Sequence, residues 1–173
     1  MLSSPFKDLR DIEYFKFEED FIEKNVRCIP MIVRFKMDAA GIKLKLAEWS
    51  RFSIGERIEL ALKACGNETE VALYKNHLAS LVKKYTGKSA TVMEVDKNPL
   101  WSITGTVPVM IEEKAMESGY DIWVSQWKSL TDLQRFALLK LCREGHENKN
   151  FPKAIMEFGF VNKRETSESR IIH

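Results

Sequence analysis

The residues best able to do chemistry lie in one short polar loop, GHENKN, which contains His146, Glu147, Asn148 and Asn150. An imidazole, a carboxylate and amides can coordinate or hydrogen-bond a ligand, and Arg143 lies one helical turn earlier. A single histidine does not complete the HExxH zinc signature, so we predict no metal site. As a structural alternative, Asn148 or Asn150 caps the helix that follows. His146 and Arg143 then bond the last carbonyls of the helix before it.

The thiol of Cys28 is a second candidate, because it follows Arg27 and precedes a predicted helix. A helix N-terminus and a neighbouring cation both lower the pKa of a thiol, which favours thiolate chemistry. The sequence places no general base beside it, so the alternative is a small side chain buried in the core. Cys65 and Cys142 lie on apolar faces of predicted helices, and we expect both to pack in the core.

Two cations, Arg135 and Lys140, interrupt the most apolar helix that the sequence predicts, over residues 132–144. A buried cation costs several kcal/mol unless it is paired and hydrogen-bonded. One interpretation is that the alkyl stems pack while the charged groups reach solvent or a carboxylate. The other is that Arg135 holds an anion or a carboxylate of a partner.

The tryptophans are Trp49, Trp101, Trp123 and Trp127. They could form a ligand box, but aromatic residues at helical spacing are more often core or interface anchors. Trp123 and Trp127 are one turn apart. We therefore predict that they line one face of a short helix capped by Asp121.

Several classes of function are disfavoured by composition. The glycines are isolated and no GxSxG motif occurs, so no phosphate loop, cofactor or catalytic residue is predicted, and a non-enzyme is favoured over an enzyme. The formal net charge is +2 and no basic run occurs, which argues against nucleic-acid binding. Three widely spaced cysteines suit a reducing compartment. No apolar stretch approaches the ~20 residues that span a bilayer. We predict a cytoplasmic protein without a membrane partner.

Apolar periodicity and capping residues predict an all-α fold. It is a compact bundle of about six or seven short helices with one long irregular loop. The predicted helices begin near Pro30, Ser53, Thr69, Pro108, Asp121, Thr131 and Asn150. Pro30 is expected as a first helical residue, Ser53 as the start of a capping box with Glu56, and Thr69 as an N-cap. The loop covers Lys88–Val107 and has room for a small hairpin at Thr91–Val95. We predict a loose arm over residues 1–15, a single domain over 16–160 and a flexible tail over 161–173.

Two runs of the sequence resemble the nitrate reductase-associated protein family, small proteins of cyanobacteria, other bacteria and some photosynthetic eukaryotes. They are RCIPMIVRFKMDAAGIKL, residues 27–44, and SLTDLQRFALLKLCREGHENKNFPKAIMEFGF, residues 129–160. The likeness spans most of residues 17–160, with little to match over 64–107. It implies a role in nitrate assimilation, in support of the production or activation of an assimilatory nitrate reductase. It implies no catalytic residues.

The leading hypothesis is a non-enzymatic accessory protein that binds the reductase or its maturation machinery. We expect its contact surface on the loop from Arg143 to Asn150, with Arg27 and Cys28 beside it. The alternative is a small enzyme, or a protein that binds a small anion or a cofactor phosphate. That alternative would use Arg135, Arg143 and His146, and it requires them to converge on a concave pocket.

Overall fold

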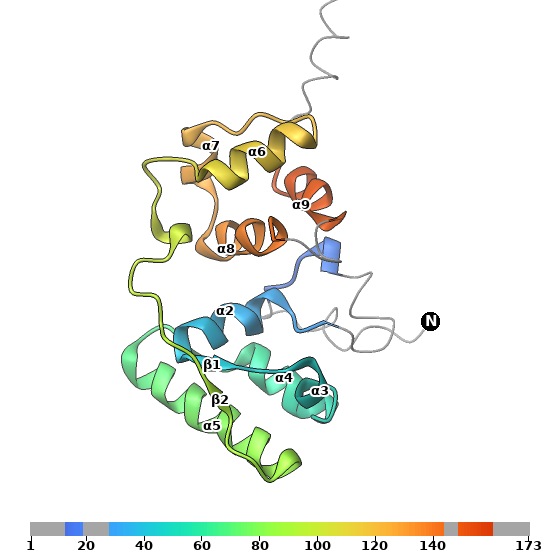
Figure 1. The fold of residues 1–173 in the computed structure, drawn as a ribbon, viewed down its shortest axis with the longest axis vertical. Helices are drawn as coiled ribbons and strands as arrows, with labels where there is room; N and C mark the ends of the chain where they lie inside the picture. The colour runs from blue at the N-terminus through green and yellow to red at the C-terminus, as the bar shows by residue number, and fades with distance from the viewer. Residues whose placement is uncertain (1–12, 19–27, 144–148, 161–173) are drawn as a thin grey trace, which may run out of the picture. The chain divides into compact units, whose positions relative to one another are not determined.

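The computed structural model describes residues 13–18, 28–143 and 149–160, and the helices and strands keep the labels of Figure 1. Within these residues lie eight α-helices, two 3-10 helices and one pair of two-residue strands. The mainly α-helical class predicted from the sequence is therefore confirmed. Every helix predicted from apolar periodicity is present, and a short one, α3, is added.

The described residues divide into two compact units, one up to Lys97 and one from Asn98 onward, which we call unit 1 and unit 2. The single domain expected over residues 16–160 stays a prediction. The expected arm and tail lie outside the described residues, apart from 13–15. Within that short stretch Phe15 is buried and stacks on Phe17, with ring centroids 5.2 Å apart.

Unit 1 is built mainly from three packed helices. Its elements are η1 (Lys16–Glu18), α2 (Met31–Ala40), β1 (Ile42–Lys43), α3 (Leu46–Trp49), α4 (Ile54–Leu62), α5 (Glu68–Thr86) and β2 (Thr91–Val92). Helix α2 packs against α5 and α4. The buried side chains of these helices include Val33, Met37, Leu60, Tyr74 and Leu78. Because each is removed from water, each stabilises the unit by an amount on the order of 1.5–3 kcal/mol.

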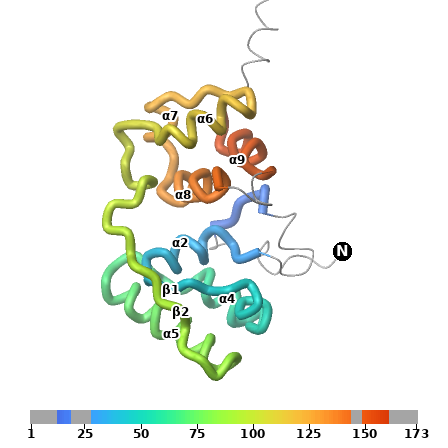
Figure 2. Tube along the Cα trace, in the orientation of Figure 1, coloured from blue at the N-terminus to red at the C-terminus, as the bar shows by residue number. Residues whose placement is uncertain are grey.

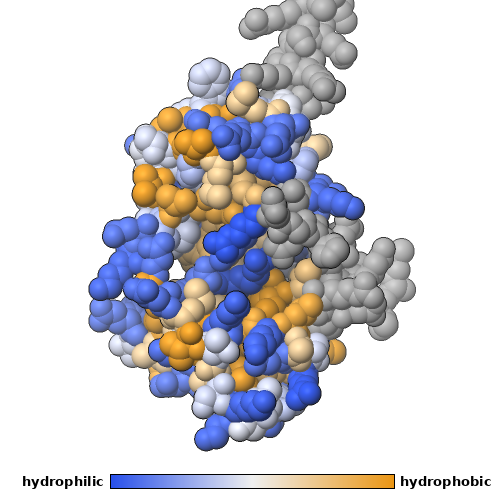
Figure 3. Space-filling model, in the orientation of Figure 1, coloured by the Kyte–Doolittle hydropathy of each residue, from blue (hydrophilic) through white to orange (hydrophobic). Residues whose placement is uncertain are grey.

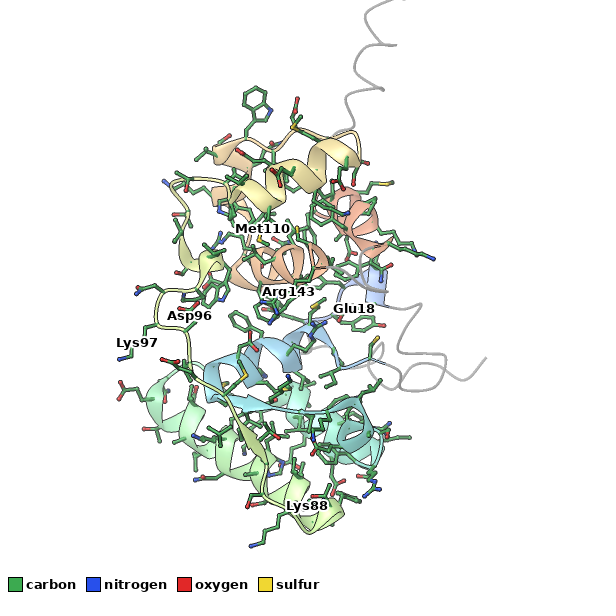
Figure 4. The ribbon with its side chains drawn as sticks, viewed as in Figure 1. Glu18, Lys88, Asp96, Lys97, Met110 and Arg143 are labelled. Atoms are coloured by element: carbon green, nitrogen blue, oxygen red, sulfur yellow. The ribbon has the colours of Figure 1, made fainter. Side chains whose placement is uncertain are left out.

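Helix α2 begins differently from the prediction. Pro30 is the residue before the helix rather than its first residue. The first N–H of the helix, on Met31, donates to Oε1 of Glu18 at 2.6 Å, while Oε2 of Glu18 accepts from the N–H of Phe15 at 3.1 Å. Glu18 is buried, and its side chain is labelled in Figure 4. A carboxylate at a helix N-terminus is favourable because it meets the positive end of the helix dipole.

Side-chain caps fix where α4 and α5 start. Ser53 and Glu56 exchange hydrogen bonds of 3.2 and 2.8 Å, so the predicted capping box is confirmed. The predicted cap of α5 is wrong, because Thr69 lies inside the helix. Instead, Oδ1 of Asn67 accepts from the N–H of Glu70 at 2.9 Å. Asn67 has the extended backbone that an N-cap needs, with φ −139° and ψ 170°.

The two strands lie far apart in the sequence but side by side in space, as the tube in Figure 2 shows. They pair antiparallel, with Ile42 opposite Val92 and Lys43 opposite Thr91. The chain turns into β1 at Gly41, whose φ of 66° few other residues adopt. A Cβ there would lie 2.9 Å from the carbonyl of Met93. The small hairpin expected within the loop is thus replaced by a pairing with β1.

Unit 2 surrounds one central helix. Its elements are η2 (Leu100–Ser102), α6 (Val109–Glu117), α7 (Val124–Ser129), α8 (Asp132–Leu141) and α9 (Phe151–Glu157). Helix α8 packs against η2, α6 and α9. Its buried side chains are Leu133, Arg135, Phe136, Ala137, Leu138 and Leu141. A helix buried on nearly every side belongs at a centre, as the apolar composition of this segment predicts.

Candidate functional site

Most of the predicted loop, including His146, Glu147 and Asn148, lies outside the described residues, and so does Arg27. Arg143 is exposed just after α8 and is labelled in Figure 4. Asn150 is buried at the start of α9, but its side chain makes no capping hydrogen bond to that helix. The contact surface expected on this loop therefore stays a prediction.

Arg135 is only 5% exposed, and its guanidinium meets the main chain. Its Nε donates to the carbonyl of Trp101 at 2.6 Å. Its Nη1 donates to the carbonyls of Leu130 at 2.5 Å and Trp127 at 3.3 Å. Its Nη2 is paired with the carboxylate of Asp132. Such charge-assisted hydrogen bonds compensate a buried cation. An anion bound by Arg135 would have to compete with these acceptors, so a ligand role for it stays a prediction.

The described thiols have environments that suit packing. Burial raises the pKa of Cys142 to about 12, and its Sγ donates to the carbonyl of Met110 at 3.6 Å. Burial also raises the pKa of Cys65, whose Sγ donates to the carbonyl of Lys36 at 3.8 Å. Both groups therefore stay protonated near neutral pH, which disfavours nucleophilic chemistry. Cys28 is half-buried.

The predicted pairing of two tryptophans on one helix face is wrong. Trp123 precedes α7 with an extended backbone, and Asp121 lies outside the helix. Only Trp127 is on the helix, where it is fully buried and its Nε1 donates to the carbonyl of Ile103 at 2.8 Å. Trp123 is 67% exposed instead. A tryptophan of this exposure keeps a large apolar area in contact with water.

Exposed apolar side chains also occur on the helix that precedes Trp123. In α6, Ile111 and Ala115 are buried, whereas Val109 and Met116 are exposed. Val109 and Met116 are seven positions apart, so they share a face of the helix, and that face is turned away from the core. The exposed Glu112, Glu113 and Glu117 lie around them. Helix α6 therefore has a second apolar stripe, bordered by carboxylates.

We call these exposed residues the α6–α7 surface. It consists of Val109, Met110, Met116, Trp123 and Val124. In Figure 3, apolar side chains reach the surface over α7 and the neighbouring part of α6. Apolar groups gathered on a surface and bordered by charged ones are typical of protein-binding sites. The sequence carried a signal for this surface, since α6 has apolar residues on two opposite faces.

A protein-family model described as "conserved nitrate reductase-associated protein" matches residues 14–158. The chain belongs to this family. The match covers most of the sequence and includes every residue of the α6–α7 surface. It confirms the resemblance that residues 27–44 and 129–160 indicate. No curated protein and no solved structure matches the chain.

For this member of the nitrate reductase-associated family, the described part of the chain sets limits on other kinds of site. None of its helices is both long enough and apolar enough to cross a membrane. Over residues 13–18, 28–143 and 149–160, no three His, Cys, Asp or Glu side chains are grouped to hold a metal ion. The features that these residues do offer are an exposed apolar surface and, as described below, a concentration of positive charge. Both are means of binding a macromolecule.

Proposed function

We propose that this protein is a non-enzymatic accessory protein of nitrate assimilation. It binds the assimilatory nitrate reductase, or the machinery that matures it, and so supports production or activation of the enzyme. Membership of the nitrate reductase-associated family supports the pathway. The observation that carries the binding role is the 67% exposure of Trp123, together with the exposed apolar stripe of α6.

Physical reasons favour the α6–α7 surface as the contact. Tryptophan is the residue type most enriched among those that dominate binding energy, and methionine adapts to irregular partner surfaces. Covering Trp123 and Met116 would remove apolar area that the fold itself leaves in water. The carboxylates of Glu112, Glu113 and Glu117 then form the polar rim that such contacts have.

The contacts of Arg135 favour this function over the binding of a small anion. That alternative needs Arg135, Arg143 and His146 to converge. The guanidinium of Arg135 is instead engaged with three carbonyls and a carboxylate. Removing the guanidinium from these acceptors would cost several kcal/mol. A weakly bound anion would not supply enough binding free energy to offset this cost.

A quantitative pull-down tests the proposal. Tagged protein is recovered from nitrate-grown cells, and the reductase is measured by mass spectrometry. The double variant Met116→Ser/Trp123→Ser should recover at least about 10-fold less reductase or maturation factor, equivalent to about 1.4 kcal/mol. The matched control is Ile54→Ser/Leu73→Ser, which replaces side chains of unit 1 that are 57% and 56% exposed.

Two outcomes contradict the proposal. Wild-type protein that recovers neither the reductase nor a maturation factor would remove the accessory role. Equal recovery by the two double variants would keep the role and move the contact elsewhere.

The loop from Arg143 to Asn150, with Arg27 and Cys28, is a proposed second contact, tested in the same assay by Arg143→Ala/His146→Ala. Unchanged recovery by that variant would exclude these two side chains.

A further inference from the structure

Six exposed cations surround the point where α5 ends. They are Lys43, Lys45, Arg51, Lys83, Lys84 and Lys88, and we call them the basic end of unit 1. They come from separate stretches of the sequence, so this cluster of cations cannot be recognised as a run of basic residues. Lys88 points away from the ribbon just past the end of α5 (Figure 4), and hydrophilic side chains cover the surface there (Figure 3).

Several contacts bring these stretches together. Nη1 of Arg51 donates to the carbonyl of Tyr85, in the last turn of α5, at 3.0 Å. Helix α3, which Lys45 precedes, packs against α5. Lys43 lies opposite Thr91, three positions after Lys88. The cations are therefore held near one another by the fold.

Among the described residues, the carboxylates at this end do not balance the positive charge. Glu48 accepts from the N–H of Lys45 at 2.8 Å. Glu56 pairs with Lys84 at 2.8 Å and also accepts from the hydroxyl of Tyr85. Both carboxylates are thus engaged locally, and they are outnumbered by the cations. The formal charge of the whole chain is only +2, so positive charge is concentrated at this end.

We propose that the basic end of unit 1 binds an acidic surface of the protein partner, as a further contact in addition to the α6–α7 surface. This inference rests on the proposed function, because it concerns the same partner. Five of the six cations are lysines, which are flexible point charges suited to diffuse attraction. The bidentate recognition of phosphates favours arginine instead, and single-stranded nucleic acid requires exposed aromatic rings for stacking. The composition thus favours a carboxylate-rich protein surface.

Attraction between such surfaces acts mainly on the rate of association. Opposite charges steer two proteins toward each other before contact, and salt screens the effect. At about 0.15 M salt the screening length is about 8 Å. We therefore expect the association rate to fall as salt is added, whereas the dissociation rate, which the apolar contact sets, changes little.

The test compares two double variants with the same change in net charge. Lys83→Glu/Lys88→Glu reverses two cations of the basic end, and Lys75→Glu/Lys97→Glu reverses two exposed lysines elsewhere in unit 1. In each pair one lysine lies on α5 and one beyond it. Association with purified nitrate reductase is followed by surface plasmon resonance, and circular dichroism checks that each variant is folded.

At low salt the basic-end variant should associate at least about 10-fold more slowly than the wild type and lose most of its salt dependence. The control variant should stay within about 2-fold of the wild type. Equal loss in both variants, or no loss in either, would overturn the inference but leave the proposed function intact. Wild-type binding to random-sequence duplex DNA that depends on Lys83 and Lys88 would overturn the assignment to an acidic protein. A wild type that does not bind the reductase at any salt concentration overturns the proposed function and the inference together.

Discussion

The guanidinium Nε of Arg135 and the main-chain carbonyl of Trp101 are joined by a hydrogen bond of 2.6 Å. The two residues lie 34 positions apart, and the bond ties η2 to the central helix of unit 2. A buried cation holds this segment to α8, because its guanidinium donates to a main-chain carbonyl of η2.

Replacing Arg135 should therefore destabilise the protein. Arg135→Met leaves the carbonyls of Trp101, Leu130 and Trp127 without this donor, and we expect a loss of about 2–4 kcal/mol in the free energy of unfolding. Urea denaturation followed by tryptophan fluorescence measures it. The control is Lys128→Met, at an exposed position of α7. A loss as small as that of the control would show that the buried bonds contribute nothing.

Lys36, on α2, caps the C-terminal end of the neighbouring helix α4. Its Nζ donates to the carbonyls of Ala61 at 2.6 Å and Lys63 at 2.7 Å. Lys36→Met keeps the length of the side chain but removes both bonds, and should cost about 1–3 kcal/mol of unfolding free energy. Thermal denaturation beside the exposed control Lys75→Met gives the difference. Equal melting temperatures in the two variants would rule out a capping role for Lys36.

The pH dependence of Lys36 has a definite sign. Burial lowers the pKa of its ammonium from 10.5, so the unfolded state holds the proton more tightly than the folded state. Stability should consequently rise as pH rises through the folded pKa toward 10.5. The rise should be missing from the stability curve of Lys36→Met, so the advantage of the wild type over this variant should grow in this window. A wild type whose advantage over the variant shrinks in this window would contradict the lowered pKa.

Two glycines allow backbone strain to be separated from steric contact. Gly41 and Gly87 have φ of 66° and 70°, but a Cβ would meet Met93 and Val95 at 2.9 Å only at Gly41. We expect Gly87→Ala to cost about 1–2 kcal/mol from the left-handed backbone alone. Gly41→Ala should cost at least about 1 kcal/mol more, because β2 must also move. Urea titration of both variants measures the loss in the free energy of unfolding. An equal loss in the two variants would mean that β2 moves away from the added Cβ without an energetic penalty.

Acid should weaken the junction of α4 and α5. The hydrogen bond from Lys84, followed by that from the N–H of Ser53, lowers the pKa of Glu56 from 4.5 to about 2. This stabilisation is present above pH 4.5 and is lost as pH falls toward 2. The stability difference between wild type and Glu56→Gln should therefore shrink over that range. Glu113→Gln, at an exposed position of α6, is the matched control.

Local signals in the sequence were sufficient to predict seven of the eight α-helices in the described residues, all but the short α3. Apolar stripes and the capping box at Ser53 predict α4, and the composition of α8 predicts its central place. Errors arose where two neighbouring residues could both act as a cap, as with Asn67 and Thr69, since capping depends on one backbone angle that composition does not fix. For the same reason, the sequence predicts too early a start for the helix that contains Trp127.

Features made by distant residues could not be predicted. Glu18 reaches the start of α2 across 13 positions, and the cations of the basic end come together only through tertiary contacts. The α6–α7 surface was missed for a different reason. Periodicity marks apolar residues, but it does not say which of two apolar faces the core will take.

The pairing of Ile42 with Val92 closes the intervening chain into a ring whose two ends meet. The stretch of chain that forms this ring contains the helices α3, α4 and α5. Its closure has an entropic cost that grows only slowly with length, so insertions in the connections between these helices should be tolerated. Because the two strands are so distant in the sequence, we expect this short ladder to form late in folding.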